Sequence, residues 1–516
     1  MAYDQSRRDV LLLGGATGLA ASALCRTQFG LASSPASAQT TANEAASSGP
    51  YTFERGFPAG ETTERAYDDA DLNRAIQSYR FFYPNVSVYG FLAGFEPLGA
   101  IYNQTAVVLE IFPRHVLFTP NSDAPFASFP IDLTSGPVAI ELPPGPLLGM
   151  ANDLNFRWIM DLGLPGPDAG KGGKHLILPP SYRGQIPSGY YPGQSTTNRL
   201  VLIVRSLPIG GDIQEALARL YLVRAYPLNE PDALFNFVNV TQADAYATPL
   251  PWEDNLGFWR VLHAIIESEP PYEPYRSNYG ELAVLGVIKG KPFAPDARMS
   301  RILAQAAKIG LAQMKVQSFA DRRPDRVVWP DRSWEWPALR PENGTFDMPN
   351  YADLDAREKW FYQSTFVSPA MFRRFPGSGS LFWFSARDNG GAYLDGGKTY
   401  RLVVPHPVPA SLFWSVTVYD PDTRSQVDSG QGKAALRSLF ELRPDIERLG
   451  SDTGAIDLFF GPKAPAGKAN QWIKTIPGKG WFSYFRIYGP EQTVFDGSWR
   501  PGDFEELKSS DGRALQ

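Results

Sequence analysis

Apolar and polar residues alternate along the first half of the chain with two periods, and each period predicts one kind of element. Between Asp68 and Leu92, apolar residues recur three or four positions apart behind several aspartates, which predicts a helix that Pro84 ends or kinks. Short apolar runs bounded by Pro and Gly then predict strands, and a second helix follows them. The strands are expected at residues 107–118, 127–132, 138–142, 150–161, 175–178 and 200–206, and the helix at 213–224.

The pattern turns helical after about residue 228 and returns to strands after residue 376. Helical spacing occurs at residues 258–267, 280–287, 296–319 and 351–366, and strand patterns occur at 394–404, 411–419, 455–460 and 481–488. The fold class predicted is α+β, mainly β, with two β-sandwich-like domains and a helical bridging region. The expected boundaries are 67–227 for the first domain, 228–376 for the bridge and 377–516 for the second domain.

The most specific stretch runs from Asn470 to Trp499. A Gly-Lys-Gly turn at 478–480 precedes an alternating segment that ends at Gly489 and Pro490, which predicts a half-buried strand between two turns. Arg486 stands between Phe485 and Ile487, so its side chain must project from the opposite face of that strand. A charge at such a position needs solvent, a cleft or a partner, and Arg486 is therefore a candidate functional residue.

The first 38 residues have the pattern of a targeting signal. Arg7 and Arg8 form a twin-arginine motif, an apolar run follows, and small residues at 36–38 form a cleavage site. We therefore expect a twin-arginine signal peptide over residues 1–38, a periplasmic mature protein, and a flexible mature N-terminus over residues 39–66. The single cysteine, Cys25, would leave with the signal, so the mature chain would hold neither a disulfide nor a thiolate nucleophile.

Composition narrows the class of partner. The net charge of −5 and the absence of a basic run argue against nucleic acid and against anionic membranes as partners. A small-molecule or oligosaccharide-like ligand remains, without membrane insertion once the signal is cleaved, and a homo-oligomer is left open. The 47 Gly and 46 Pro favour many turns and strands over long helices.

Standard catalytic and metal motifs are absent from the sequence. There is no G-x-S-x-G elbow and no H-E-x-x-H, and the four histidines stand far apart, so we expect no metal site and leave the cofactor open. Of the histidines, His115 is the best candidate for a functional role because it lies eight residues before Asp123. What remains is a set of charges within apolar strands, which must form ion pairs, bind a ligand, or do both. These charges are Asp123, Asp153, Arg157, Asp161, Arg424 and Arg486.

Several of these residues lie on motifs that resemble a bacterial family of paired domains of unknown function, numbered 1254 and 1214. The resemblance rests on P-N-x-D at 120–123, T-R-S at 423–425 and the C-terminal run N-x-W-I-x-T-x-P-G-K-G-W followed by R-x-Y-G-P. It implies that the C-terminal partner covers about residues 387–506. Many members carry Thr and Tyr after the first Asp, where this chain has Ala124, Pro125 and Phe126, so a tyrosine-assisted mechanism is not expected.

Together these residues predict a composite site between the two β domains. The leading hypothesis is an exported hydrolase that acts on a small or oligomeric organic substrate, in which a carboxyl group serves as acid or base and an arginine holds negative charge. The alternative is a periplasmic protein that binds a sugar or an aromatic compound without catalysis. The catalytic candidates are Asp123, Asp153 and Arg157; the substrate-binding candidates are Asn121, Trp158, Arg424, Trp472, Lys474 and Arg486.

Overall fold

The computed structural model describes residues 46–243, 251–340, 345–377 and 379–508. The predicted signal peptide and Cys25 lie outside these residues. The described residues divide into two units, the first ending at Glu64 and the second beginning at Arg65. In the first, an antiparallel sheet holds three short strands, and the Thr62 hydroxyl accepts a hydrogen bond from the Thr52 amide at 2.8 Å. The strands are β1 (Ala46–Ser48), β2 (Tyr51–Glu54) and β3 (Phe57–Pro58).

Helix α1 (Gly60–Phe95) is longer than the pattern predicts and continues through Pro84. Its central side chains pack into two apolar cores, and Tyr79, Tyr83 and Val86 are fully buried. Tertiary packing contributes most of the stability of a helix in a folded protein, so this burial outweighs the loss of one backbone donor at Pro84. The helix expected between Asp68 and Leu92 is therefore present, and of the two alternatives given for Pro84, that it ends the helix is wrong.

The first β region consists of two sheets that enclose an apolar core. The six-stranded sheet has the order β13 (Asn236–Asn239), β4 (Thr105–Leu109), β5 (Phe126–Asp132), β11 (Arg199–Ser206), β7 (Leu147–Asp153), β8 (Trp158–Gly163). The four-stranded sheet has the order β10 (Tyr190–Gln194), β9 (Gly173–Leu178), β6 (Val138–Leu142), β12 (Arg224–Pro227). Residues 150–161, expected as one strand, form β7 and β8 with a turn between them, in which the Asp153 amide donates to the Arg157 carbonyl at 3.1 Å.

The second β region is likewise a pair of four-stranded sheets around one core. One has the order β14 (Ser380–Ser385), β20 (Phe482–Pro490), β16 (Ala410–Tyr419), β17 (Ala435–Arg437), and the other β19 (Trp472–Lys474), β18 (Gly454–Gly461), β15 (Tyr400–His406), β21 (Glu505–Glu506). Strand β20 is buried along its whole length, so the prediction of a half-buried strand is wrong for its second face. Phe485 and Ile487 enter the sandwich core, while Arg486 and Tyr488 line a cavity on the other side.

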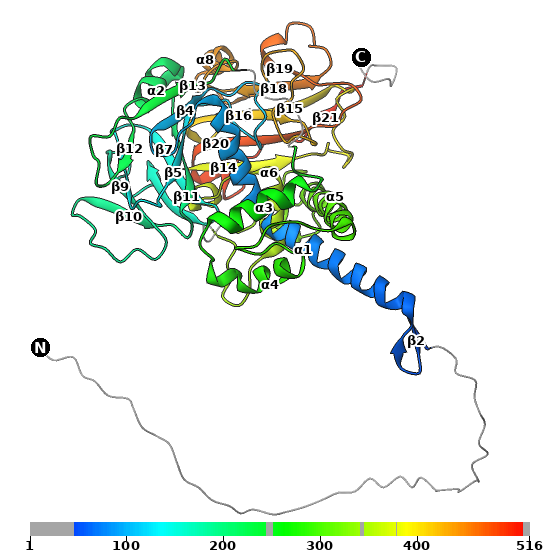
Figure 1. The fold of residues 1–516 in the computed structure, drawn as a ribbon. Coiled ribbons are helices and arrows are strands. Elements are labelled where there is room, and N and C mark those ends of the chain that lie inside the picture. The colour runs from blue at the N-terminus through cyan, green and yellow to red at the C-terminus, as the bar shows by residue number, and fades with distance from the viewer. Residues whose placement is uncertain (1–45, 244–250, 341–344, 378, 509–516) are drawn as a thin grey trace, which may run out of the picture. The chain divides into compact units, whose positions relative to one another are not determined.

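Helices connect and flank the two β regions. Figure 1 shows α3, α4 and α5 gathered below the strands, and their apolar side chains share one core with α1. Asp212, Asp296 and Asp353 cap the N-termini of α2, α5 and α6 through their side chains. The helices are α2 (Ile213–Leu220), α3 (Gly257–Ser268), α4 (Arg276–Val284), α5 (Ala297–Phe319), α6 (Leu354–Gln363), α7 (Pro369–Phe372) and α8 (Arg443–Leu449). The sheet-rich α+β class is confirmed, while the domain boundaries stay a prediction.

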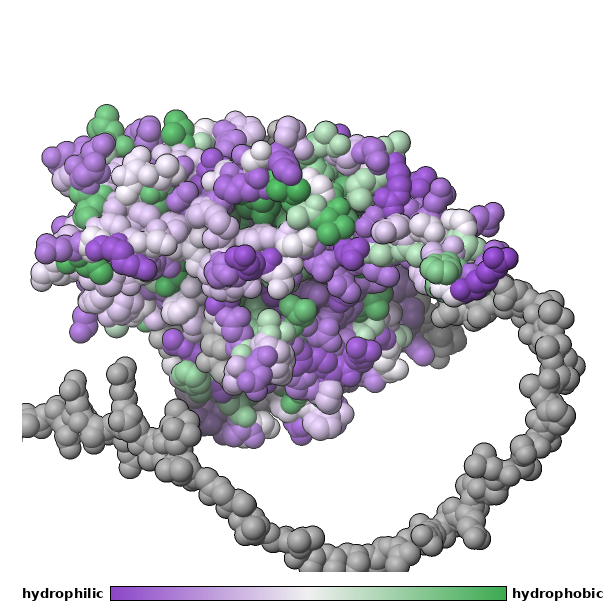
Figure 2. All heavy atoms as spheres, turned by 60° about the horizontal axis from the view of Figure 1, so that its bottom comes forward, coloured by the Kyte–Doolittle hydropathy of each residue, from purple (hydrophilic) through white to green (hydrophobic). Residues whose placement is uncertain are grey.

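None of the helices in the described ranges is both long and apolar enough to cross a membrane. On the face that Figure 2 shows, hydrophilic side chains dominate and apolar ones form small groups.

Candidate functional site

A cavity of about 120 Å³ lies where the two β regions meet, and we call it the arginine cavity. Strands β5, β7, β8 and β11 contribute one wall, strands β14 and β20 another, and residues of α1, of 117–121 and of 360–371 complete it. Its charged lining residues are Asp161, Arg205 and Arg486, and its polar lining residues include Thr119, Asn121 and Tyr488. Aromatic and aliphatic side chains make up most of the rest.

Arg486 enters the cavity because β20 alternates its side chains between the two faces of the sheet. Its Nη1 donates to the Tyr419 hydroxyl at 2.6 Å and its Nη2 donates to the Thr119 carbonyl at 2.7 Å. The guanidinium also lies over the ring of Tyr484, 5.0 Å from the ring centroid. These neutral partners fix the position of the charge without neutralising it.

Arg205 reaches the same cavity from β11. Its Nη1 donates to Asn121 Oδ1 at 3.0 Å, and its guanidinium lies 5.3 Å from the centroid of the Phe126 ring. Asn121 in turn donates from Nδ2 to the Tyr488 hydroxyl at 2.5 Å. Burial lowers the pKa of Arg205. Since a guanidinium keeps its proton at neutral pH, the cavity holds two fixed positive charges.

Thr119 contributes strained backbone to the cavity wall. It has a φ of 40°, a region that β-branched residues rarely adopt. Three hydrogen bonds hold it there: its amide donates to the Arg424 carbonyl at 2.7 Å, its hydroxyl donates to the Gln363 carbonyl at 2.7 Å, and its carbonyl accepts from Arg486. Strain of this kind clusters at functional sites, where it holds groups in a fixed position.

Asp123 lies behind the wall, two residues after Asn121, and is not itself a lining residue. It is buried, its Oδ2 accepts from the Ser415 hydroxyl at 2.9 Å, and its Oδ1 has no hydrogen-bond partner within the described residues. Burial raises the pKa of Asp123, and the positive charges of Arg486 and Arg437 oppose that rise. Asp123 and Arg486, which the sequence analysis places in one composite site, thus interact electrostatically, while the catalytic role of Asp123 stays a prediction.

Asp161 is the carboxyl group that faces the cavity. It lies on β8, and its Oδ1 accepts from Trp158 Nε1 at 3.2 Å. Burial raises the pKa of Asp161 to about 6, against the opposing effect of hydrogen bonds from Ser368 and Trp158. A carboxyl group with a pKa near 6 can both donate and accept a proton near neutral pH, which is what general acid–base catalysis requires.

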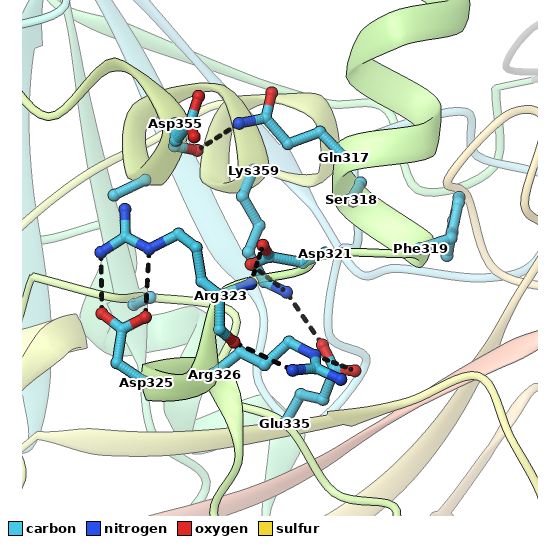
Figure 3. A network of polar contacts seen from close by, with 12 residues as sticks. Gln317, Ser318, Phe319, Asp321, Arg323, Asp325, Arg326, Glu335, Asp355 and Lys359 are labelled. Atoms are coloured by element: carbon cyan, nitrogen blue, oxygen red, sulfur yellow. Dashed lines mark hydrogen bonds and ion pairs between the residues drawn. The ribbon is translucent and has the colours of Figure 1, made fainter. Parts of the chain in front are cut away.

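Neither guanidinium group in the arginine cavity forms a direct ion pair with the described part of the chain, although Asp161 lines the same cavity and Asp123 interacts electrostatically with both arginines. Among the described residues, neither Arg205 nor Arg486 has a carboxylate oxygen within ion-pair distance, although ion pairs are common elsewhere. Figure 3 shows the contrast: Lys359 Nζ lies 3.1 Å from Asp321 and 2.9 Å from Glu335, so two carboxylates enclose that buried ammonium. Buried charges are ordinarily paired in this way, so a buried Arg486 and a partly buried Arg205 without ion pairs differ from the other buried charges described above.

The predicted first-domain residues Asp153, Arg157 and Trp158 do not line the cavity. Both carboxylate oxygens of Asp153 accept hydrogen bonds from the protein. Its Oδ2 accepts from the Thr196 amide at 2.8 Å and from the Thr196 hydroxyl at 2.5 Å, and its Oδ1 accepts from the Arg157 amide at 2.9 Å. The Arg157 guanidinium pairs with Asp347. Trp158 contributes indirectly, through its hydrogen bond to Asp161.

The remaining predicted residues lie elsewhere in the second β region. Arg424 is buried and pairs with Glu253, and its Nη2 donates to the Tyr83 hydroxyl at 3.0 Å. Trp472 and Lys474 belong to β19; Trp472 Nε1 donates to the Gly461 carbonyl at 2.9 Å, and the Lys474 side chain is exposed. Of the nine predicted site residues, Asn121 and Arg486 therefore line the arginine cavity and Asp123 adjoins it.

The sequence reasoning missed Arg205 and Tyr488 and left Asp161 out of the proposed site. The sequence pattern around Arg205 could have identified it. The run V-L-I-V-R-S places a charged residue within an apolar strand, as F-R-I does at Arg486. Within the described part of the chain, no group of three or more His, Cys, Asp or Glu residues is arranged to hold a metal ion. His115, the preferred histidine, is buried and lines a second cavity.

Two family models match the chain. Residues 103–225 match the family described as "Protein of unknown function (DUF1254)", and residues 379–492 match "Protein of unknown function (DUF1214)". The predicted pairing of these two domains is thereby confirmed. No curated protein matches the chain.

Two solved structures are similar to it. The crystal structure of the VPA0106 protein from Vibrio parahaemolyticus has 16% identity and a TM-score of 0.53, over 85% of this chain and 100% of that one. This likeness shows a shared fold. An uncharacterised protein from Burkholderia cenocepacia has 11% identity and a TM-score of 0.38, over 86% of this chain and 96% of that one.

Proposed function

We propose that this protein binds a small organic carboxylate in the arginine cavity. The observation that carries the proposal is the pair of guanidinium groups of Arg205, which is partly buried, and Arg486, which is buried; neither has a carboxylate oxygen within ion-pair distance among the described residues. A ligand carboxylate would supply the missing negative charge and accept charge-assisted hydrogen bonds from one or both arginines.

The neighbouring groups support a carboxylate of modest size. Asn121 and the Tyr488 hydroxyl lie beside the arginines and offer further hydrogen bonds, while the rings of Phe382 and Tyr484 supply apolar walls. A cavity of about 120 Å³ with such walls suits the head of an organic acid. Small-molecule sites are commonly apolar pockets with a few convergent polar groups.

A second candidate function, acid–base catalysis on the bound acid, is favoured by Asp161. The carboxyl group of Asp161 lines the same cavity as the arginines, and its raised pKa allows proton transfer near neutral pH. The sequence hypothesis of a hydrolase gives the acid or base role to Asp123; we assign it instead to Asp161, which lines the cavity, and an arginine would stabilise negative charge on the reacting oxygen. Asp123 would then hold Arg486 electrostatically and would not touch the substrate.

Calorimetric titration of the purified protein with acetate, propanoate and benzoate tests the binding proposal. We expect Arg205→Gln to weaken carboxylate binding by tenfold or more, because it removes one charge that is desolvated. Arg205→Lys keeps the charge but loses the planar fork, so an intermediate loss is expected. Arg199→Gln is the matched control, since Arg199 lies on the same strand and its Nε is 3.7 Å from Asp132.

Two outcomes would contradict the proposal. One is the absence of binding by any acid in the panel, and the other is equal affinity for the wild type and for Arg205→Gln. Circular dichroism and thermal unfolding of each variant show whether a loss of binding follows from unfolding.

A further inference from the structure

A second and larger cavity lies along the C-terminal part of α1. Its volume is about 450 Å³, and we call it the apolar cavity. Helix α1 contributes Tyr89, Ala93 and Gly94, strand β4 contributes Leu109, and the segment after β4 contributes Val116. Ser87, His115 and Thr365 are the hydrophilic residues among its described lining. Most of its wall is therefore aliphatic or aromatic.

The apolar cavity and the arginine cavity share part of their walls. Phe91, Leu117, Phe118 and Thr365 line both, so the two cavities adjoin at these side chains. The Phe and Leu side chains that line the apolar cavity favour an apolar group there. The guanidinium groups that line the arginine cavity favour an anion there. A single ligand that extends past these residues would satisfy both requirements.

His115 adds one polar contact to the apolar cavity. Its side chain is buried, its Nδ1 accepts a hydrogen bond from the Phe112 amide at 2.9 Å, and the Thr241 backbone also interacts with the ring. Because Nδ1 is an acceptor, Nε2 carries the ring proton and can donate it to a ligand hydroxyl or carbonyl. This feature is compatible with an alkyl chain that carries one polar group.

We infer that the ligand is an amphipathic carboxylate, whose head lies at Arg205 and Arg486 and whose alkyl body fills the apolar cavity. This inference rests on the proposed function and names its ligand class. Apolar pockets of some 300–1,000 Å³ typically hold small molecules, so the apolar cavity has room for more than the head group alone.

A homologous series of ligands tests the inference on the full chain. Calorimetric titration with straight-chain acids from acetate to decanoate, each below its micelle concentration, should show the Kd falling by about fourfold for each added methylene until the cavity is filled. Straight-chain alcohols of the same lengths should bind at least tenfold more weakly, because they offer the arginines no charge.

A variant of Gly94 tests where the alkyl body lies. Gly94 lines the apolar cavity from α1, and a Cβ at this position would meet no other atom within 4 Å. We expect Gly94→Phe to place its ring in the cavity and abolish the gain with chain length, while acetate binds as in the wild type. Gly280→Phe is the matched control, since Gly280 lies on α4, also has open space at its Cβ, and lines neither cavity.

The outcomes separate the inference from the proposed function. A Kd that is the same for acetate and decanoate, or a Gly94→Phe variant that binds decanoate as the wild type does, would overturn the inference and leave carboxylate binding intact. Equal binding of acids and alcohols, together with no effect of Arg205→Gln, would overturn the proposed function. No binding by any member of the series would overturn both.

Discussion

At the scale of single residues, the arginine cavity holds ionisable side chains that are shielded from water, which disfavours their charged forms. Asp161 shows the effect of this burial on pKa most directly. Its carboxyl group is 5% exposed and its pKa is raised to about 6 from 3.8. The folded protein therefore holds more protons than the unfolded chain between about pH 4 and pH 6. The free energy of unfolding accordingly falls as pH rises through this window, and the full cost remains above it.

Replacing Asp161 with Asn should remove that cost while keeping the shape of the side chain and its acceptor for Trp158. We expect Asp161→Asn to be more stable than the wild type by up to about 3 kcal/mol at pH 7.5, with the difference vanishing near pH 3.5. Urea unfolding at both pH values measures this. Asp232→Asn, at an exposed turn, serves as the control, and an Asp161→Asn protein less stable than the wild type at pH 7.5 would disprove the argument.

At the scale of elements, alternation identified strand β20 and the burial of Phe485 and Ile487, because these depend on neighbours in sequence. It could not show that Tyr488 contacts Asn121, since that hydrogen bond joins residues 367 positions apart. The turn between β7 and β8 was missed for a local reason. Phe156 has a φ of 59° there, where the sequence offers no glycine to announce a left-handed residue.

The same limit applies to Arg424, which the sequence offered as a ligand contact. The structure instead pairs its guanidinium with Glu253, which precedes α3, and with Tyr83 of α1. All three side chains are buried. A pattern of residues along the chain shows that a buried charge needs a partner, but it does not show whether the partner is a ligand or a carboxylate from another element.

Breaking this pair should destabilise the protein strongly. Glu253→Gln leaves the Arg424 charge buried without a carboxylate, and loss of one member of a buried pair costs about 3–5 kcal/mol. Chemical denaturation measures the loss, with Glu230→Gln at an exposed turn as the control. A loss below about 1 kcal/mol would mean that Tyr83 and the backbone carbonyls around Arg424 suffice to hold its charge.

At the scale of the whole molecule, residues 65–516 are joined by buried polar contacts that cross between the β regions and the helices. Ser415 of β16 donates to Asp123 at 2.9 Å, the Tyr419 hydroxyl donates to the Pro120 carbonyl at 2.7 Å, and Tyr484 of β20 donates to Gln363 of α6 at 2.5 Å. Separating the regions would expose apolar surface and leave these groups without partners, so each region depends on the others for its stability.

We therefore expect residues 65–516 to unfold in one cooperative transition although the sequence suggests two β domains. In differential scanning calorimetry, the calorimetric and van't Hoff enthalpies should agree, and tryptophan fluorescence should report the same midpoint as far-ultraviolet circular dichroism. Ser415→Ala should lower that single midpoint without splitting the transition, because it removes a contact that both β regions share. Two resolved transitions in the wild type would instead show that the β regions fold independently, and the arginine cavity would then be an interface between autonomous domains.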